Sequence, residues 1–129
     1  MKHLWVFISL CISLTSERAL ANDVGPAFFN ATDGAVSVEI TFSAGSGFSG
    51  DLGADGLMGW PFPWQVRTMK VHMKRGGNLA VSEAQVTRLR GKLTKPGNQL
   101  WVIDTSHVCV LDSRRFKAVK GVRCPAPAR

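Results

Sequence analysis

The fold is decided by residues 86–124, VTRLRGKLTKPGNQLWVIDTSHVCVLDSRRFKAVKGVRC. Residues 96–98, Pro-Gly-Asn, form a turn signal between two apolar runs. Residues 100–103 are continuously apolar, which is typical of a strand buried on both faces, and a further apolar run begins at Val108. We therefore predict an antiparallel meander whose end is closed by a disulfide between Cys109 and Cys124.

The start of this stretch fits two structures. Ser82 with Gln85 three residues later forms a capping box, and Gly91 suits the C-terminal stop of a short helix near residues 83–91. Val86 and Leu89, however, also fit a strand with a glycine bend that leads into the meander. We favour the helix because its start and stop signals agree, and the strand remains the alternative.

Two further strands are predicted upstream. Apolar and polar residues alternate along residues 36–42 and along residues 64–74, the period of a strand with one buried face. The second alternation slips at Thr68 and Met69, which indicates a bulge. Residues 44–59 between them are rich in glycine, so we expect a long flexible loop there.

These patterns predict a mostly β fold. We expect five to six strands in a small antiparallel sheet or partly closed barrel, with at most one short helix and one disulfide. In pattern alone, and over roughly residues 86–112, this meander resembles the small barrels that bind oligonucleotides or oligosaccharides. No motif of that class accompanies the pattern, so the resemblance implies no function.

The N-terminus is typical of a secretory signal peptide. Lys2 precedes an apolar run over residues 4–14, and Ala19-Leu-Ala21 fits the small-residue rule for cleavage. The run is too short to span a bilayer, which takes about 20 residues. An uncleaved anchor or a buried core segment is the alternative. We predict a secreted or periplasmic protein, cleaved after Ala21, whose residues 22–129 form one small domain with a tail that frays after Cys124.

The mature chain would retain two cysteines, because Cys11 leaves with the signal peptide. In an exported chain such a pair, Cys109 and Cys124, is most simply a disulfide. A metal site would need further ligands, and no CxxC or HxxxH spacing supplies them. We accordingly predict no metal and no cofactor.

Charge is unevenly distributed along a chain whose net charge is +7. Residues 22–66 hold five acidic residues and no Lys or Arg, whereas residues 67–129 hold fourteen basic residues against three acidic ones. The split indicates self-complementary packing, a basic face for an anionic partner, or a surface that only keeps the protein soluble. The candidate binding residues are Arg67, Lys70, Lys74, Arg75, Arg88, Arg90, Arg114, Arg115 and Lys117, with Trp60 and Trp64 as stacking platforms.

Trp60 and Trp64 flank Pro-Phe-Pro, which enforces an extended path and presents large rings at low conformational cost. The two rings either plug the core or contact a ligand. Trp101 has apolar neighbours, so we predict it to be a core residue. Residues 30–32, Asn-Ala-Thr, are a glycosylation acceptor triplet, which would lie at the surface if the source is eukaryotic.

No reaction signature is complete. Residues 45–50 match the spacing GxGxxG, but an acidic, glycine-broken segment follows instead of a helix. Asp51 and Asp55 supply only part of a calcium loop. Asp104, Ser106 and His107 are neighbours in sequence, whereas a catalytic triad requires convergence in space, and turn chemistry accounts for the first two.

The sequence therefore predicts an exported, non-enzymatic binding or interaction protein that meets an anionic macromolecule or acidic protein surface through its basic C-terminal portion. One alternative is a small secreted hydrolase that uses His72 and His107. Another is a subunit or effector of an envelope or secretion assembly, in which residues 60–64 dock a partner protein.

Overall fold

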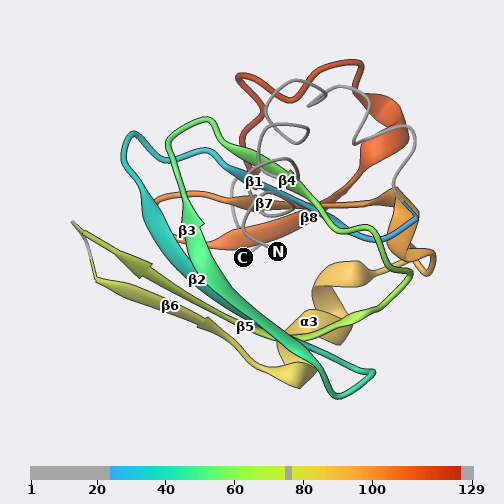
Figure 1. Cartoon of the computed structure of the whole chain (residues 1–129). Coiled ribbons are helices and arrows are strands. Elements are labelled where there is room, and N and C mark those ends of the chain that lie inside the picture. The colour runs from blue at the N-terminus through green and yellow to red at the C-terminus, as the bar shows by residue number, and fades with distance from the viewer. Residues whose placement is uncertain (1–23, 75–76, 126–129) are drawn as a thin grey trace, which may run out of the picture.

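The computed structural model describes residues 24–74 and 77–125 (Figure 1). The predicted signal peptide, Arg75 and the last four residues of the tail lie outside the described residues. The prediction of a mostly β chain with one short helix and one disulfide is confirmed. The strands are β1 (Ala27–Asn30), β2 (Val36–Phe42), β3 (Gly47–Leu52), β4 (Leu57–Gly59), β5 (Val66–Met73), β6 (Asn78–Val81), β7 (Gln99–Ile103) and β8 (Val108–Asp112). The helix is α3 (Glu83–Arg90), and two 3₁₀ turns are η1 (Pro96–Asn98) and η2 (Ser113–Arg115).

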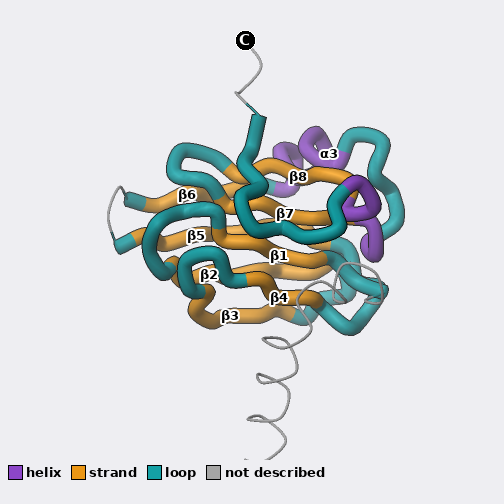
Figure 2. The backbone as a smooth tube through the Cα atoms, turned by 90° about the horizontal axis from the view of Figure 1, so that it is seen from above, coloured by secondary structure: helices purple, strands orange, loops and turns teal. Residues whose placement is uncertain are grey.

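The strands form two open sheets rather than one curled sheet. The central sheet has the order β4-β1-β7-β8, and the outer sheet has the order β3-β2-β5-β6. Figures 1 and 2 show the two sheets as stacked layers. Within the central sheet β1 runs parallel to β7, with Ala27 opposite Leu100 and Asn30 opposite Ile103. The sequence predicts five or six strands in a single antiparallel sheet or partly closed barrel, whereas the described residues form eight strands in two open four-stranded sheets.

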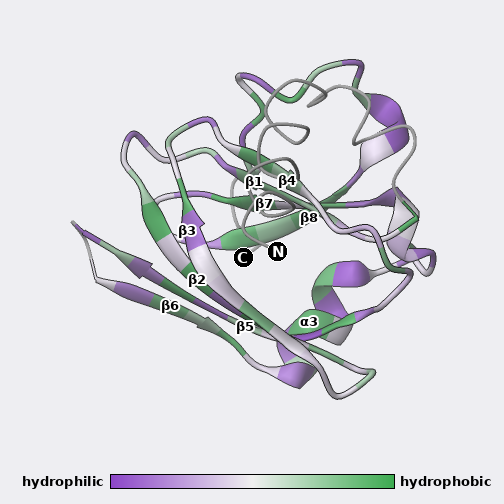
Figure 3. Cartoon of the chain, in the orientation of Figure 1, coloured by the Kyte–Doolittle hydropathy of each residue, from purple (hydrophilic) through white to green (hydrophobic). Residues whose placement is uncertain are grey.

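A hydrophobic core fills the space between the sheets. The outer sheet contributes alternate residues of β2 and β5, and Figure 3 shows hydrophobic and hydrophilic bands alternating along β5. The central sheet contributes Phe28 and Trp101, whose rings stack with centroids 6.5 Å apart. Trp101 is fully buried and donates its indole N–H to Oε1 of Gln99 (3.2 Å), which confirms its prediction as a core residue.

The other face of the central sheet is covered by residues 113–125, named here the C-terminal segment. Phe29, Leu100 and Val102 point to this side and pack with Val119 of the segment. The disulfide between Cys109 on β8 and Cys124 ties the segment to the sheet. Because both faces are covered, β1 and β7 are buried at every position, as the continuous apolar run of β7 predicts.

The ambiguous segment is a helix. Ser82 Oγ accepts the backbone N–H of Gln85 (3.3 Å), and Gln85 Oε1 accepts the backbone N–H of Ser82 (2.8 Å), so both halves of the capping box form. Gly91 ends the helix with φ +53, a conformation that disfavours a side chain. Contacts of α3 with β5 and β8 bridge the two sheets, and Val86 enters the core between them.

We expect Ser82→Ala to lower the free energy of unfolding by about 1 kcal/mol, because the cap of α3 loses its acceptor. Urea unfolding measures the effect. Ser46→Ala, in an exposed turn between β2 and β3, is the matched control and should change the free energy of unfolding by less than about 0.5 kcal/mol. Equal effects of the two substitutions would mean that the capping box contributes nothing to stability.

The glycine-rich residues 44–59 are not a single flexible loop, since β3 and β4 lie within them. β3 pairs with β2 along six residues, and β4 pairs with β1. At Gly50 an added Cβ would lie 2.8 Å from Cζ of Phe48, so any larger residue there would displace the Phe48 ring. The slip predicted near Thr68 is present as a register shift, in which Thr41 faces Thr68 and Phe42 faces Val66.

Candidate functional site

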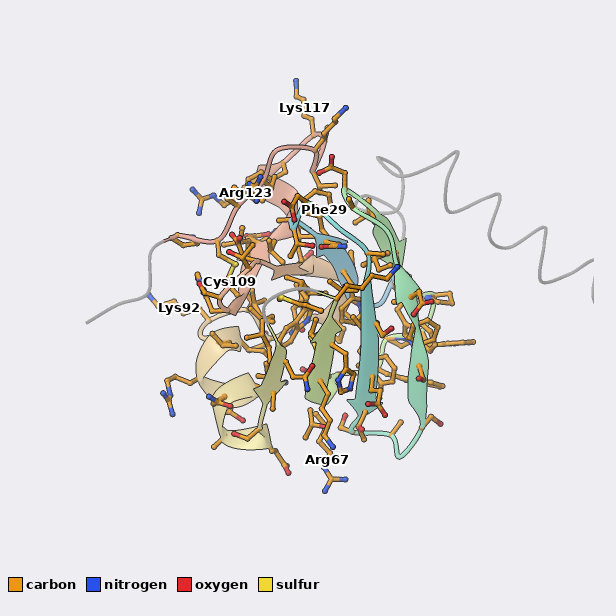
Figure 4. All side chains as sticks on the ribbon, turned by 90° about the vertical axis from the view of Figure 1, so that its left-hand side faces the viewer. Phe29, Arg67, Lys92, Cys109, Lys117 and Arg123 are labelled. Atoms are coloured by element: carbon orange, nitrogen blue, oxygen red, sulfur yellow. A yellow bond between two sulfur atoms is a disulfide. The ribbon has the colours of Figure 1, made fainter. Side chains whose placement is uncertain are left out.

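The predicted cationic residues fall in three regions of the structure. The outer sheet carries Arg67 and Lys70 on β5 and Lys74 just after it. The helix α3 carries Arg88 and Arg90. The C-terminal segment carries Arg114, Arg115 and Lys117. Figure 4 shows Arg67 and Lys117 at opposite ends of the molecule. The fold therefore does not bring the whole predicted set together on one face.

Two of these cations, Arg67 and Arg114, form ion pairs with the protein's own acids, and so does Arg123, which is not among the predicted residues. Arg67 lies 3.3 Å from the carboxylate of Glu83, and Arg123 lies 3.8 Å from that of Asp104. Lys70 stands directly opposite Glu39 in the register of β5 and β2. The outer sheet and the outer part of α3 thus carry balanced charge, and self-complementary pairing accounts for part of the charge split in the sequence.

The third region gathers cations from segments that are distant in sequence. The Ser113 hydroxyl donates to the carbonyl of Gly97 (3.3 Å), which joins η2 to η1, and α3 packs against β8 just before η2. These contacts link the end of α3, the loop that follows it and η2, although Figure 4 shows Lys117 well above Lys92. We name the basic surface by its exposed cations, Arg88, Lys92, Lys95, Arg114, Arg115 and Lys117.

Asp112 neutralises one member of the basic surface. Its carboxylate accepts Arg114 Nε (3.0 Å) and Nη2 (2.8 Å), and it also accepts the backbone N–H of Arg114 (3.0 Å), which caps η2. These hydrogen bonds from Arg114 lower the pKa of Asp112 below its ordinary value. Asp112 is therefore a carboxylate at neutral pH and forms an ion pair with Arg114. The other five cations of the basic surface form no ion pair within residues 24–74 and 77–125.

Trp60 and Trp64 belong to an aromatic cluster with Phe42, Phe48 and Phe62. Trp60 stacks on Phe42 of β2 with centroids 4.9 Å apart, and Phe62 stacks on Trp64 at 4.8 Å. Both tryptophans are partly buried and pack against the core between the sheets, while Phe62 is 48% exposed. The Nε1 atom of Trp60 is buried without a hydrogen-bond partner. The predicted stacking platforms thus serve mainly to close the core.

The two histidines lie on different sheets. His72 is on the exposed face of the outer sheet, where its Nε2 is 3.0 Å from Glu39 Oε2. His107 precedes β8, with Nδ1 at 3.1 Å from Ser106 Oγ and Nε2 at 3.1 Å from the carbonyl of Pro125. Neither residue lines the hollow between α3 and β5 that is described below. Nothing in this geometry favours a shared catalytic site.

Asp104 has a structural role in the turn between β7 and β8. Its carboxylate accepts the backbone N–H of Thr105 (2.8 Å) and that of Cys124 (3.2 Å). The turn chemistry predicted for this residue is present, and the carboxylate also anchors the end of the C-terminal segment. The neighbouring Ser106 and His107 bond to each other without Asp104.

The loop motifs do not form a ligand site. Gly47 and Gly50 lie within β3, so residues 45–50 lead into a strand and not into the helix that a dinucleotide loop requires. The Asp51 carboxylate accepts the Ser37 hydroxyl across the sheet (2.7 Å). Within the part of the chain that the structure describes, no three His, Cys, Asp or Glu side chains gather as metal ligands, and no helix is long and apolar enough to cross a membrane.

The acceptor triplet at residues 30–32 is buried, not exposed. The side chain of Asn30 has no exposed surface, and its amide nitrogen lies within hydrogen-bond distance of the carbonyls of Gly34 (2.8 Å), Leu52 (2.9 Å) and Gly53 (3.0 Å). Asn30 Oδ1 accepts the backbone N–H (2.9 Å) and the hydroxyl (2.6 Å) of Thr32. A glycan on the Asn30 amide would displace these bonds, so the expectation of a surface glycosylation site is corrected.

Sequence reasoning missed a hollow of about 260 Å³ between α3 and the start of β5. Its walls are Ser43, Gln65, Val66, Arg67, Glu83, Val86, Thr87 and Arg90. The spacing of Glu83, Val86 and Arg90 could have placed them on one helix face, because residues three, four and seven positions apart align. Nothing in the sequence indicates that Ser43 and Gln65 face them.

The geometry thus defines two candidate binding regions, the basic surface and the hollow beside α3. Comparison of the chain with protein-family models, with curated proteins and with solved structures finds no match.

Proposed function

We propose that this protein is an exported, non-enzymatic binding protein that holds an anionic macromolecule at the basic surface. The feature that supports the proposal is a set of exposed cations on the end of α3, the loop after it and the C-terminal segment, which form no ion pair among the described residues: Arg88, Lys92, Lys95, Arg115 and Lys117. Asp112 is the only acid in the segments that form this surface, and Arg114 already pairs with it. The positive charge there is available to a partner.

The chemistry of the surface indicates which contacts the partner makes. Its cations are long, exposed side chains, whereas Trp60 and Trp64 are partly buried against the core, so the partner is held mainly by its charged groups. Phosphate, sulfate and carboxylate groups on nucleic acids, glycans, lipid headgroups or acidic proteins all meet this requirement. The disulfide supports a protein of an oxidising compartment, and we propose that it is secreted or periplasmic after cleavage at Ala21.

The expected result is binding to polyanions that weakens steeply with salt, because bound counterions are released on association. Duplex DNA, a sulfated glycan and vesicles with anionic lipid are offered to the mature protein at low and at high salt. Substitution of Lys92→Gln together with Arg115→Gln should weaken binding and lower the slope of log affinity against log salt by about 1 to 2.

The matched control is Lys70→Gln together with Lys74→Gln, which removes the same charge from the outer sheet. It should leave the slope nearly unchanged. Equal losses from both pairs would show that net charge alone attracts the partner. Binding that is absent, or that does not respond to salt, would overturn the proposed function.

One observation favours the second candidate, a subunit or effector of an envelope or secretion assembly. Phe62 and Val24 are 48% and 54% exposed. An added Cβ on Gly25 would lie 2.0 Å from the carbonyl oxygen of Phe62, so the two apolar residues belong to neighbouring stretches of backbone. If Phe62→Ser abolishes the capture of a partner protein while the Lys92 and Arg115 substitutions do not, the docking function is favoured.

A further inference from the structure

We propose that the hollow between α3 and β5 is a binding site for a carboxylate group, carried by a small or chain-terminal ligand and received by Arg90. This site is distinct from the basic surface and does not depend on the proposed function.

The hollow is formed by two elements that face each other. Glu83, Val86, Thr87 and Arg90 lie on one face of α3, and the opposite wall is the start of β5 with Gln65 and Ser43 before it. Its volume of about 260 Å³ lies just under the range of about 300–1,000 Å³ that is usual for drug-sized ligands. The space therefore suits a group the size of one amino-acid residue.

Arg90 carries a donor that has no acceptor among residues 24–74 and 77–125. Its Nη1 donates to Oε1 of Gln65, while its Nε is buried without a hydrogen-bond partner. Gln65 is itself fixed, since its Nε2 donates to the carbonyl of Thr94 (3.0 Å). An unpartnered buried N–H is unfavourable, and a carboxylate is the acceptor that the guanidinium edge fits best. Because Nε is shielded from solvent, we expect the guanidinium to turn toward the hollow on binding.

The charges that line the hollow select a singly charged ligand. Arg67 and Glu83 form an ion pair at 3.3 Å, with side chains 51% and 66% exposed, so this pair stands at the mouth and contributes little net charge. Arg90 then leaves a net charge of about +1, which matches one carboxylate. A doubly charged phosphate would bring one negative charge more than Arg90 offsets.

The apolar part of the hollow selects what the carboxylate is attached to. Val66 and Val86 are only 2% and 1% exposed and belong to the core between the sheets. With so little exposed area, these side chains offer a short alkyl group an apolar contact and offer a bare inorganic anion no polar partner. The Thr87 hydroxyl already donates to the carbonyl of Glu83 (3.1 Å), so it does not compete for the ligand.

The probe for this site is butyrate, with butyramide as the uncharged equivalent of the same shape. Titration of the mature protein, followed by amide chemical shifts, should give saturable changes confined to residues 82–91, 43 and 65–67. Butyramide and inorganic phosphate should bind at least tenfold more weakly than butyrate. Equal responses to butyrate and butyramide would overturn the proposal without the need for any variant.

Variants test the role assigned to Arg90. Arg90→Gln should lower butyrate affinity at least tenfold, and Arg90→Lys, which retains the charge but not the planar edge, should also weaken it. Arg88→Gln is the control because it removes the same charge from the same helix at a position outside the hollow. Wild-type affinity in both Arg90 variants, or an equal loss in Arg88→Gln, would refute the site.

The same control separates this site from the basic surface. Arg88→Gln should weaken polyanion binding and leave butyrate binding unchanged. Arg90→Lys should weaken butyrate binding and leave polyanion binding unchanged.

The source of the carboxylate is tested with acetyl-Ala-Ala and its C-terminal amide. Tighter binding of the free acid than of butyrate indicates a chain terminus as ligand, and weaker binding indicates a small acid. Equal binding of the peptide acid and its amide would contradict recognition of a chain terminus.

Discussion

Asn30→Asp should lower the free energy of unfolding by about 4 kcal/mol, among the largest effects expected of any single substitution in this chain. The buried amide of Asn30 donates to carbonyls on either side of it, at Gly34, Leu52 and Gly53. A carboxylate has no hydrogen to donate, so these carbonyls lose their partner and a negative charge is placed among them. Urea unfolding followed by tryptophan fluorescence measures the change.

The matched control is Asn78→Asp on β6, an exposed edge position. It should change the free energy of unfolding by less than about 0.5 kcal/mol. Asn30→Ala should fall between the two variants, because it removes the donor without adding a charge. An Asn30→Asp protein as stable as the Asn78→Asp protein would show that the amide network does not stabilise the fold.

Loss of the disulfide should have the next largest effect. Replacement of both Cys109 and Cys124 by alanine should lower the free energy of unfolding by about 3 kcal/mol, the contribution expected for a bridge that closes a loop of 15 residues. The same change should release the C-terminal segment from the central sheet, where Val119 covers Phe29 and Leu100. Hydrogen exchange is therefore expected to accelerate in residues 113–125 before it does so in β2 or β5.

Reduction provides the control for this prediction. Dithiothreitol should shift the unfolding midpoint of the wild-type protein to that of the double alanine variant and should leave the variant unchanged. Equal midpoints of the oxidised wild type and the variant would contradict a stabilising role for the bridge. Uniform acceleration of exchange throughout the chain would contradict a local attachment of the C-terminal segment.

Local signals in the sequence predicted the elements that depend on near neighbours. Alternation along residues 36–42 predicts β2, the apolar run at residues 100–103 predicts a strand buried on both faces, and the capping box at Ser82 predicts the start of α3. Each signal reflects a periodicity or a hydrogen bond within a few residues. The disulfide between Cys109 and Cys124 was also predictable, because these are the two cysteines that follow residue 21.

The features that sequence reasoning missed depend on distant contacts. Glycines at residues 44–59 indicate flexibility, yet β3 forms because its backbone pairs with β2 and because Gly50 leaves room for the Phe48 ring. The uneven distribution of charge along the sequence indicates one basic face. In the folded chain, however, Arg67 and Lys117 lie at opposite ends of the molecule. Gln65 meets Arg90 only because α3 packs beside the start of β5.

The parallel pairing of β1 with β7 also has a consequence for synthesis of the chain. Residues 27–30 can pair with β4 on one side early, but their other side must wait for residues 100–103 to be synthesised. During translation the N-terminal strand therefore remains without this neighbour until most of the polypeptide has left the ribosome. Pairing over such a separation slows folding, so the nascent chain should stay open until it is nearly complete.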